Sequence, residues 1–408
     1  MIRNHLPVSV GAIKDAAELL YPVIHMTAMD HSATFSELTG LDVYLKQENF
    51  QKTGSFKIRG AYNKIHNLSI KERQKGVIAA SAGNHAQGVA YAAALLNTKA
   101  TIIMPEGAPI TKATATKGYG AEVILAGENY DAAYEKAIEI QKETGATFVH
   151  AFNDAHIIAG QGTIGIEMLD QQPDLDAILV PVGGGGLISG IATAAKAKKT
   201  GVKVIGVEAA GAPSMKASLK EGKVNVIEGF NTIADGIAVK TPGDITFKIV
   251  KELVDDVVVV DDEEIATAVL MLLERSKMVA EASGAVTLAA LLAGKVSLPG
   301  IQKAACVISG GNIDVNIISQ IINRGLVKTG RLARFRTIIP DRPGSLQQLL
   351  SIIARAKANI ITVNHDRLKT TVPITETMVE LTMETRDSQH VQNIADILDQ
   401  SGYPTETI

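Results

Sequence analysis

The sequence alternates short β-branched runs with alanine-rich stretches over most of its length, and this alternation constrains the fold more than any other feature. Runs bounded by turn residues predict strands at 76–80, 100–105, 122–125, 177–181 and 202–207. The stretches between them predict helices, among them 86–96, 130–144 and 187–199. Such alternation is typical of an α/β protein whose parallel sheets are covered by helices on both faces. Ligands of these folds bind beyond the carboxyl ends of the strands, so we expect the functional loops after residues 80, 181, 207 and 308.

The pattern changes after Leu326. A half-buried strand is predicted at 334–339, followed by a helix that ends near Lys357, and then by two strands and a helix at 359–365, 375–383 and 388–400. This β-α-β-β-α order indicates a separate α+β unit. We therefore expect a first domain at 1–326, a linker at 327–332 and a second domain at 333–408.

Composition and charge exclude several classes of protein. The 408 residues exceed what one hydrophobic core normally holds. The formal net charge is −3 and the basic residues are scattered among acids, which argues against a nucleic-acid-binding protein. The N-terminal run has no apolar core of a signal peptide, and no apolar run reaches about 18 residues, so we expect a cytoplasmic protein that does not bind a membrane. The single cysteine, Cys306, lies in an apolar run and is interpreted as a core residue.

A lysine near the N-terminus is the first chemical candidate. Lys57 lies in the run 52–60, where desolvation and neighbouring cations would lower its pKa and make its amine a nucleophile toward an aldehyde cofactor. Gly54 permits a sharp turn, Ser55 can cap the helix that follows, and Phe56 offers a flat apolar surface. The alternative is a solvated surface lysine.

A glycine-rich loop follows the strand predicted at 177–181. Gly183, Gly184, Gly185 and Gly186 open a helix, so their amides and the helix dipole can bind a phosphate. Glu208 ends the next strand, where a dinucleotide-binding fold keeps its ribose-binding acid. The glycine spacing departs from G-x-G-x-x-G, which leaves an NAD-dependent dehydrogenase as a weaker alternative.

A second loop, at 81–88, also joins a strand to a helix. Its small residues and exposed amides can hold a carboxylate, and Asn84 can hydrogen-bond a phenolic oxygen. His85 is either catalytic or packed within the first helical turn.

Two further positions stay open on sequence alone. Ser309 either meets a ring nitrogen or simply ends a strand, and Glu281 either orients a ligand or caps the helix that begins near Ser283.

Together, the runs 53–60, 81–85, 183–186 and 309–312 resemble the pyridoxal-phosphate enzymes of the tryptophan-synthase β-like fold, and among them most closely the threonine dehydratases. The resemblance covers about residues 5–325 and implies a two-domain open parallel-sheet fold with a small subdomain at about 54–151. It also implies a role for each matching residue. Lys57 would bind pyridoxal 5'-phosphate covalently and Phe56 would pack on its ring. Asn84 would meet its 3-hydroxyl, the glycine loop its phosphate, and Ser309 its ring nitrogen. The substrate would be bound by the loop residues, which are Ser81, Ala82, Gly83, Asn84 and His85.

The resemblance implies β-elimination of L-threonine to 2-oxobutanoate and ammonia, with Lys57 as the general base and L-serine as a second substrate. Threonine synthases are similar but have Asp and Arg after the lysine, where this chain has Ile58 and Arg59. Serine racemases are similar too, yet they use a serine as proton donor where this chain has Ala82. Racemases also resemble each other in an acidic metal site after the strand that corresponds to the one ending at Glu208, and 209–215 contains no acid here, so we expect no divalent metal, while a monovalent cation near Glu208 stays open. A non-catalytic amino-acid sensor of the same fold is a further alternative.

The tail resembles the ACT domains that bind amino acids. Effector-binding candidates are Asp341, Pro343, Gly344, Ser345 and Leu346, which lie between a predicted strand and a helix. The helix start could receive the carboxylate of an effector, and the resemblance implies a branched-chain amino acid and a homo-oligomer, dimer or tetramer. The alternative is a capped turn without a ligand.

Overall fold

The computed structural model describes residues 6–296, 299–368 and 370–408, so the first five residues of the N-terminal run assessed above lie outside it. The chain separates into two compact units, Met1–Ile313 and Asp314–Ile408. Helix α14 (Val315–Lys328) therefore belongs to the second unit, whereas we expected the first domain to run to residue 326. No helix in the described ranges is long and apolar enough to cross a membrane.

The larger sheet of the first unit has the order β1-β2-β10-β7-β8-β9. Its neighbours pair in parallel except β1 with β2. The strands are β1 (Met29–His31), β2 (Asp42–Lys46), β7 (Ala177–Pro181), β8 (Lys203–Ala209), β9 (Asp256–Val260) and β10 (Lys303–Val307). The predicted strands at 177–181 and 202–207 are confirmed as β7 and β8. Strand β7 is buried throughout, as a central parallel strand covered on both faces must be.

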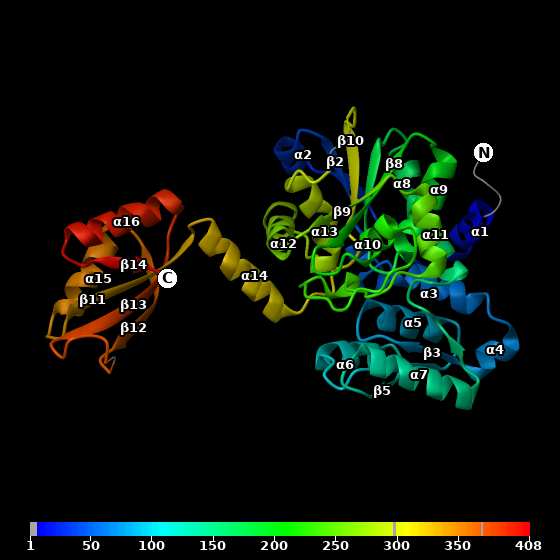
Figure 1. Ribbon diagram of the computed structural model, residues 1–408, viewed down its shortest axis with the longest axis horizontal. Coiled ribbons are helices and arrows are strands. Elements are labelled where there is room, and N and C mark those ends of the chain that lie inside the picture. Colours follow the sequence, from blue (N-terminus) through cyan, green and yellow to red (C-terminus); the bar gives the residue numbers. More distant parts are fainter. Residues whose placement is uncertain (1–5, 297–298, 369) are drawn as a thin grey trace. The chain divides into compact units, whose positions relative to one another are not determined.

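Helices cover both faces of this sheet (Figure 1). One layer contains α1 (Val10–Leu20), α8 (Ala155–Gln171), α9 (Gly186–Lys198) and α11 (Asp244–Leu253), and the other contains α2 (Ala33–Thr39), α12 (Asp262–Ser276) and α13 (Ala282–Leu292). A short helix, α10 (Ser214–Glu221), follows β8. Helices α8 and α9 approach closely at Gly190, where a Cβ atom would lie 2.3 Å from the Ile158 carbonyl oxygen. Cys306 of β10 is fully buried, as expected.

The smaller sheet is parallel and has the order β5-β4-β3-β6. Its strands are β3 (Val77–Ala80), β4 (Ala100–Met104), β5 (Glu122–Leu125) and β6 (Thr147–Phe148). Its helices are α3 (Lys57–His66), α4 (Ile70–Lys75), α5 (Asn84–Leu95), α6 (Ile110–Gly118) and α7 (Tyr130–Thr144). One apolar cluster joins α3 and α5 to the sheet, and a second joins α7 to it. All of these strands lie between residues 54 and 151, the proposed limits of the small subdomain.

The second unit folds around an antiparallel sheet of order β12-β13-β11-β14. After α14 come β11 (Leu332–Pro340), α15 (Ser345–Arg355), β12 (Asn359–Asp366), β13 (Glu376–Glu384), α16 (Ser388–Gln400) and β14 (Thr405–Thr407). Buried and exposed positions alternate along β11, as its sequence predicted, and its buried side chains pack with α15 and α16. The short strand β14 adds a sixth element to the expected order. Residues 329–331 separate α14 from β11 within the second unit, so the segment 327–332, expected as a linker, does not join the two units.

Candidate active site

A cavity of about 640 Å³ in the first unit is lined by loops of both sheets. It lies beyond the carboxyl ends of β3, β7 and β10, as parallel sheets predict. The loop that follows β8 does not line it, contrary to our expectation. The predicted site residues that line the cavity are Phe56, Lys57, Ser81, Ala82, Gly83, Asn84, His85, Gly183, Gly184, Gly185, Gly186 and Ser309.

Lys57 is the first residue of α3 and is half-buried in this cavity. Its Nζ atom lies 3.4 Å from the Ala151 carbonyl oxygen and 5.1 Å from the centroid of the Phe56 ring. Burial lowers the pKa of Lys57 to about 8, and the charge of Glu281 opposes that shift. Desolvation, one of the two causes that we expected, therefore lowers this pKa, while the neighbouring charge that acts on Lys57 is a carboxylate and not a cation. An amine of this pKa is partly unprotonated near neutral pH.

The turn before Lys57 confirms the expectation for Gly54 but not the one for Ser55. Gly54 adopts φ +71°, and a Cβ atom there would lie 2.4 Å from Asn312 Oδ1, so a glycine is required. Ser55 does not cap α3, because Phe56 occupies the N-cap position. The buried Ser55 Oγ has no hydrogen-bond partner among the described residues. The Phe56 amide donates to the Ser309 carbonyl oxygen at 3.2 Å, which ties the lysine turn to the loop after β10.

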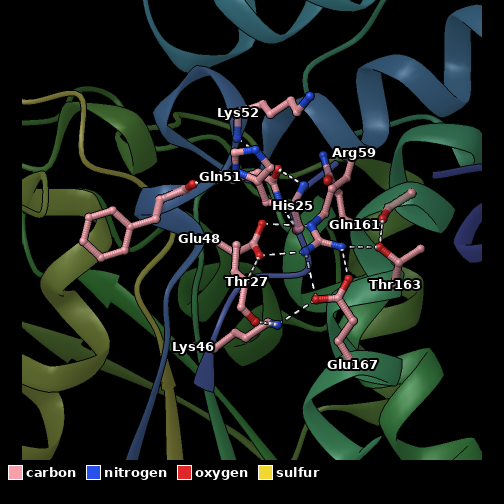
Figure 2. Close-up of polar contacts among 12 residues, drawn as sticks. His25, Thr27, Lys46, Glu48, Gln51, Lys52, Arg59, Gln161, Thr163 and Glu167 are labelled. Atoms are coloured by element: carbon pink, nitrogen blue, oxygen red, sulfur yellow. Dashed lines mark hydrogen bonds and ion pairs between the residues drawn. The ribbon is translucent and has the colours of Figure 1, made fainter. Parts of the chain in front are cut away.

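A buried ionic cluster, which the sequence did not indicate, anchors the first turn of α3 (Figure 2). Arg59 donates to Glu48 from Nε and Nη2, at 2.8 and 2.7 Å, and to Glu167 from Nη1 and Nη2, at 2.5 and 3.0 Å. Lys46 donates to the same Glu167 at 2.6 Å. Because the two cations and two carboxylates balance, this buried cluster can hold α3 against β2 and α8 without a net charge.

Asn84 begins α5 and bonds to residues of the other sheet. Its Nδ2 donates to Glu281 Oε1 at 2.7 Å, and its Oδ1 accepts from Asn312 Nδ2 at 2.8 Å. Glu281 also lines the cavity. It occupies the N-cap position of α13 without a side-chain capping bond to the described residues, so the capping interpretation is wrong. Burial raises the pKa of Glu281 to about 7.

The glycine loop leads directly into α9 and is closely packed. Gly185 adopts φ +91°, and a Cβ atom at Gly184 would lie 2.3 Å from the ring of Phe152. A Cβ atom at Gly183 would lie 3.0 Å from Ile237 Cα. The described residues provide no side-chain cap for the N-terminus of α9. Its amides and dipole are therefore available to an anion in the cavity, which fits a phosphate group.

Burial lowers the pKa of both histidines of the site, to about 3 for His85 and about 4 for His150, which favours neutral rings near pH 7. His85 is buried with its Nε2 2.8 Å from the Val149 carbonyl oxygen, and burial, together with Lys57, lowers its pKa to about 3. Its burial and this hydrogen bond favour the packed interpretation of His85 over an acid–base role. His150, which we did not single out, lines the cavity and accepts the Phe152 and Asn153 amides on Nδ1 at 3.2 and 3.0 Å.

Glu208 does not serve the cavity. It is fully buried, and its carboxylate accepts the amides of Met215 and Lys216 at the start of α10, both at 2.8 Å. Its interpretation as a ribose-binding acid, and with it the NAD-dependent dehydrogenase, loses its basis. Within the described residues no group of His, Cys, Asp and Glu could hold a metal ion.

The effector candidates lie in the second unit, on the turn from β11 into α15. Gly344 adopts φ +92° at the N-cap of α15, and Ser345 is buried. The carboxylate of Asp341 accepts from Arg367 at 2.5 Å, and its amide donates to the Thr375 carbonyl oxygen at 2.9 Å.

Comparison with known proteins identifies the class that the fold and cavity define. The family model of pyridoxal-phosphate dependent enzymes matches residues 20–310, and the chain belongs to this family. The cavity offers what such a cofactor needs, namely a half-buried amine of lowered pKa, a helix N-terminus that no described side chain caps and a mostly apolar lining that includes Phe56.

Two relatives and two solved structures show which named proteins the chain resembles. The chain is 54% identical to an L-threonine ammonia-lyase of Thermotoga maritima over 401 residues, 98% of this chain and 100% of the relative. It is 49% identical to an L-threonine ammonia-lyase of Geobacter sulfurreducens, over 97% of this chain and 98% of the relative. Among solved structures, the processed form of threonine deaminase isoform 2 from Solanum lycopersicum is 36% identical with a TM-score of 0.73, over 79% of this chain and 98% of that one. Maize serine racemase is 38% identical with a TM-score of 0.74, over 79% and 98%.

Proposed function

We propose that this protein is a threonine ammonia-lyase that converts L-threonine to 2-oxobutanoate and ammonia and also acts on L-serine. The observation that carries the proposal is the cavity that brings Lys57 together with Asn84, the glycine loop and Ser309. The near full-length similarity to two L-threonine ammonia-lyases supports the same substrate.

Each residue of the cavity has a proposed task toward the cofactor. Gly183–Gly186 and the α9 N-terminus bind its phosphate, Phe56 packs on its ring, and Ser309 meets the ring nitrogen. When bound, pyridoxal phosphate withdraws electrons from the substrate α-carbon and makes its proton acidic. A neutral serine hydroxyl at the ring nitrogen moderates that withdrawal, which suits an elimination in which the leaving group departs soon after the α-proton.

The chain's own residues move the proton and orient the substrate. The Lys57 amine removes the α-proton, since its pKa of about 8 leaves part of it unprotonated near neutral pH. The loop from Ser81 to His85 offers amides at the start of α5 to the substrate carboxylate. Loss of the β-hydroxyl then yields an enamine that water converts to 2-oxobutanoate and ammonia.

Ala82 favours elimination over racemisation. Racemisation needs a proton donor on the substrate face opposite Lys57, and the methyl group of Ala82 cannot donate a proton. This residue lines the cavity, although solved serine racemases are among the structures to which the chain is similar.

The second unit is proposed to bind a regulatory amino acid. The amides at the start of α15 would donate hydrogen bonds to its carboxylate, and the turn from Asp341 to Leu346 would surround it. We assign a branched-chain amino acid as the effector and a homo-oligomer as the assembly.

Purified protein reconstituted with pyridoxal phosphate tests the activity. We expect 2-oxobutanoate and ammonia in equal amounts from L-threonine, and pyruvate from L-serine. A non-catalytic sensor of the same fold would bind L-threonine without releasing either product, and that result would refute the proposal.

A further inference from the structure

The side chain of Glu281 makes no helix-capping hydrogen bond to the described residues, although its position at the start of a helix would allow one. Glu281 occupies the N-cap position of α13, and its backbone amide donates to the Gly310 carbonyl oxygen at 3.0 Å. The residue is 6% exposed, and its side chain reaches across to Asn84 instead. Burying a carboxylate in this way costs free energy, which suggests a role beyond the stability of α13.

A chain of hydrogen bonds ends at this carboxylate, and only one assignment of donors and acceptors fits all of its bonds. The Thr53 carbonyl oxygen is an acceptor only, so Asn312 must face it with Nδ2, at 2.7 Å. The same Nδ2 donates to Asn84 Oδ1 at 2.8 Å, and Asn84 must then donate from Nδ2 to Glu281. Asn84 keeps one further amide hydrogen for a ligand in the cavity that it lines.

The backbone leaves room for this arrangement at one glycine. A Cβ atom at Gly310 would lie 2.5 Å from Glu281 Oε1 and 3.1 Å from Asn84 Nδ2. Since β10 leads into Gly310 and α5 begins at Asn84, the contact joins the loops of both sheets at the cavity wall.

We propose that Glu281 is a positioning residue that fixes the side-chain amide of Asn84, so that its NH2 group faces a cavity ligand carrying an acceptor oxygen on an aromatic ring. The inference rests on the proposed function, in which that oxygen is the phenolic oxygen of pyridoxal phosphate. Glu281 acts only through Asn84 and does not touch the substrate.

The hold of Glu281 on Asn84 should depend on pH, because burial and the surrounding charges set the pKa of the Glu281 carboxyl. The charged groups that act on it are Lys57 from α3, Lys112 from α6 and Asp235 from the short helix η3 (Asp235–Ile237), while Asn84 hydrogen-bonds it. Burial outweighs that bond and raises the pKa of Glu281 to about 7. Above that pH the carboxylate is a stronger acceptor and holds Asn84 more firmly.

The test measures the affinity of the apoenzyme for pyridoxal phosphate by calorimetry. Glu281→Ala should weaken binding about tenfold, as the loss of one well-placed hydrogen bond does. Asn84→Ala should weaken it similarly, and the double variant should be no weaker than Asn84→Ala alone. Glu208→Gln is the matched control. Glu208 is another buried carboxylate with a pKa raised to about 7, and it lies outside the cavity. The Glu208→Gln variant should bind pyridoxal phosphate as tightly as the wild type does.

The outcomes separate this inference from the proposed function. Additive losses in the double variant, or wild-type affinity in Glu281→Ala, would overturn the role of Glu281 even if the wild type produces 2-oxobutanoate. A wild type that binds the cofactor without turnover would refute the proposed reaction and leave the Glu281 result valid. Should Glu281→Ala fail to fold, Glu281→Gln replaces it. We expect Glu281→Gln to bind pyridoxal phosphate more weakly than the wild type, with a smaller loss of affinity than Glu281→Ala. Unchanged affinity would contradict the role of Glu281.

Discussion

Lys57 and Ala82 determine the proposed chemistry at the scale of single residues. Lys57 is made reactive by burial rather than by neighbouring charge, since Arg59 is bonded to two carboxylates. Its proposed role could be inferred from sequence only because the runs 53–60, 81–85, 183–186 and 309–312 together resemble one family. The contribution of Glu281 could not, because its partner Asn84 is brought beside it only by folding.

Ala82→Ser should introduce racemisation. A serine hydroxyl on the cavity wall supplies the proton donor that a methyl group lacks, so we expect D-serine to form from L-serine at least about tenfold faster than in the wild type. Chiral chromatography of the reaction mixture measures it. Equal D-serine formation by both proteins would show that Ala82 does not set the reaction outcome.

Glu208 should make stability depend on pH. Its pKa is raised to about 7 by burial, so the folded state favours the protonated acid; the stabilisation is complete below the ordinary pKa of 4.5 and is lost as pH rises through 7. Relative to Glu208→Gln, the wild type should lose on the order of 3 kcal/mol between about pH 4 and pH 8. Urea denaturation at both pH values measures the difference. A constant gap between the proteins would contradict the assignment.

At the scale of elements, the buried cluster around Arg59 couples the lysine helix to the larger sheet. Strands such as β3, β4 and β7 were predictable because their apolar runs are local signals. The cluster was not, because Glu48, Arg59 and Glu167 come from η1 (Glu48–Phe50), α3 and α8, and each alone resembles a surface charge. The carboxyl ends of parallel strands predicted the place of the cavity, although the loop after β8 does not line it and Glu208 of β8 accepts amides of α10 instead.

Arg59→Met should destabilise the protein strongly. Removing the guanidinium leaves the buried Glu48 without its cation, a loss of about 3–5 kcal/mol in unfolding free energy. Arg275→Met, an exposed position on α12, is the control and should change it by less than about 0.5 kcal/mol. Equal denaturation midpoints for the two variants would contradict a structural role for the cluster.

At the scale of the whole molecule, two units with separate cores correspond to the two proposed activities. Deleting 314–408 removes the whole second unit, including α14. The sequence alone placed the boundary between the units later, after residue 326. We expect the remaining chain to retain turnover of L-threonine and to lose its response to branched-chain amino acids. Initial rates with and without each of these amino acids measure this. An undiminished response in the shortened chain would place the effector site in the first unit.

The central claim is that Lys57 is the base of a threonine ammonia-lyase, and production of 2-oxobutanoate from L-threonine by Lys57→Ala tests it most directly. Lys52→Ala is the matched control, because Lys52 lies in the same run but outside the cavity. We expect Lys57→Ala to lose at least about 1,000-fold in kcat, in line with removal of a general base, while Lys52→Ala stays within about twofold of the wild type. Wild-type turnover by Lys57→Ala would contradict the account.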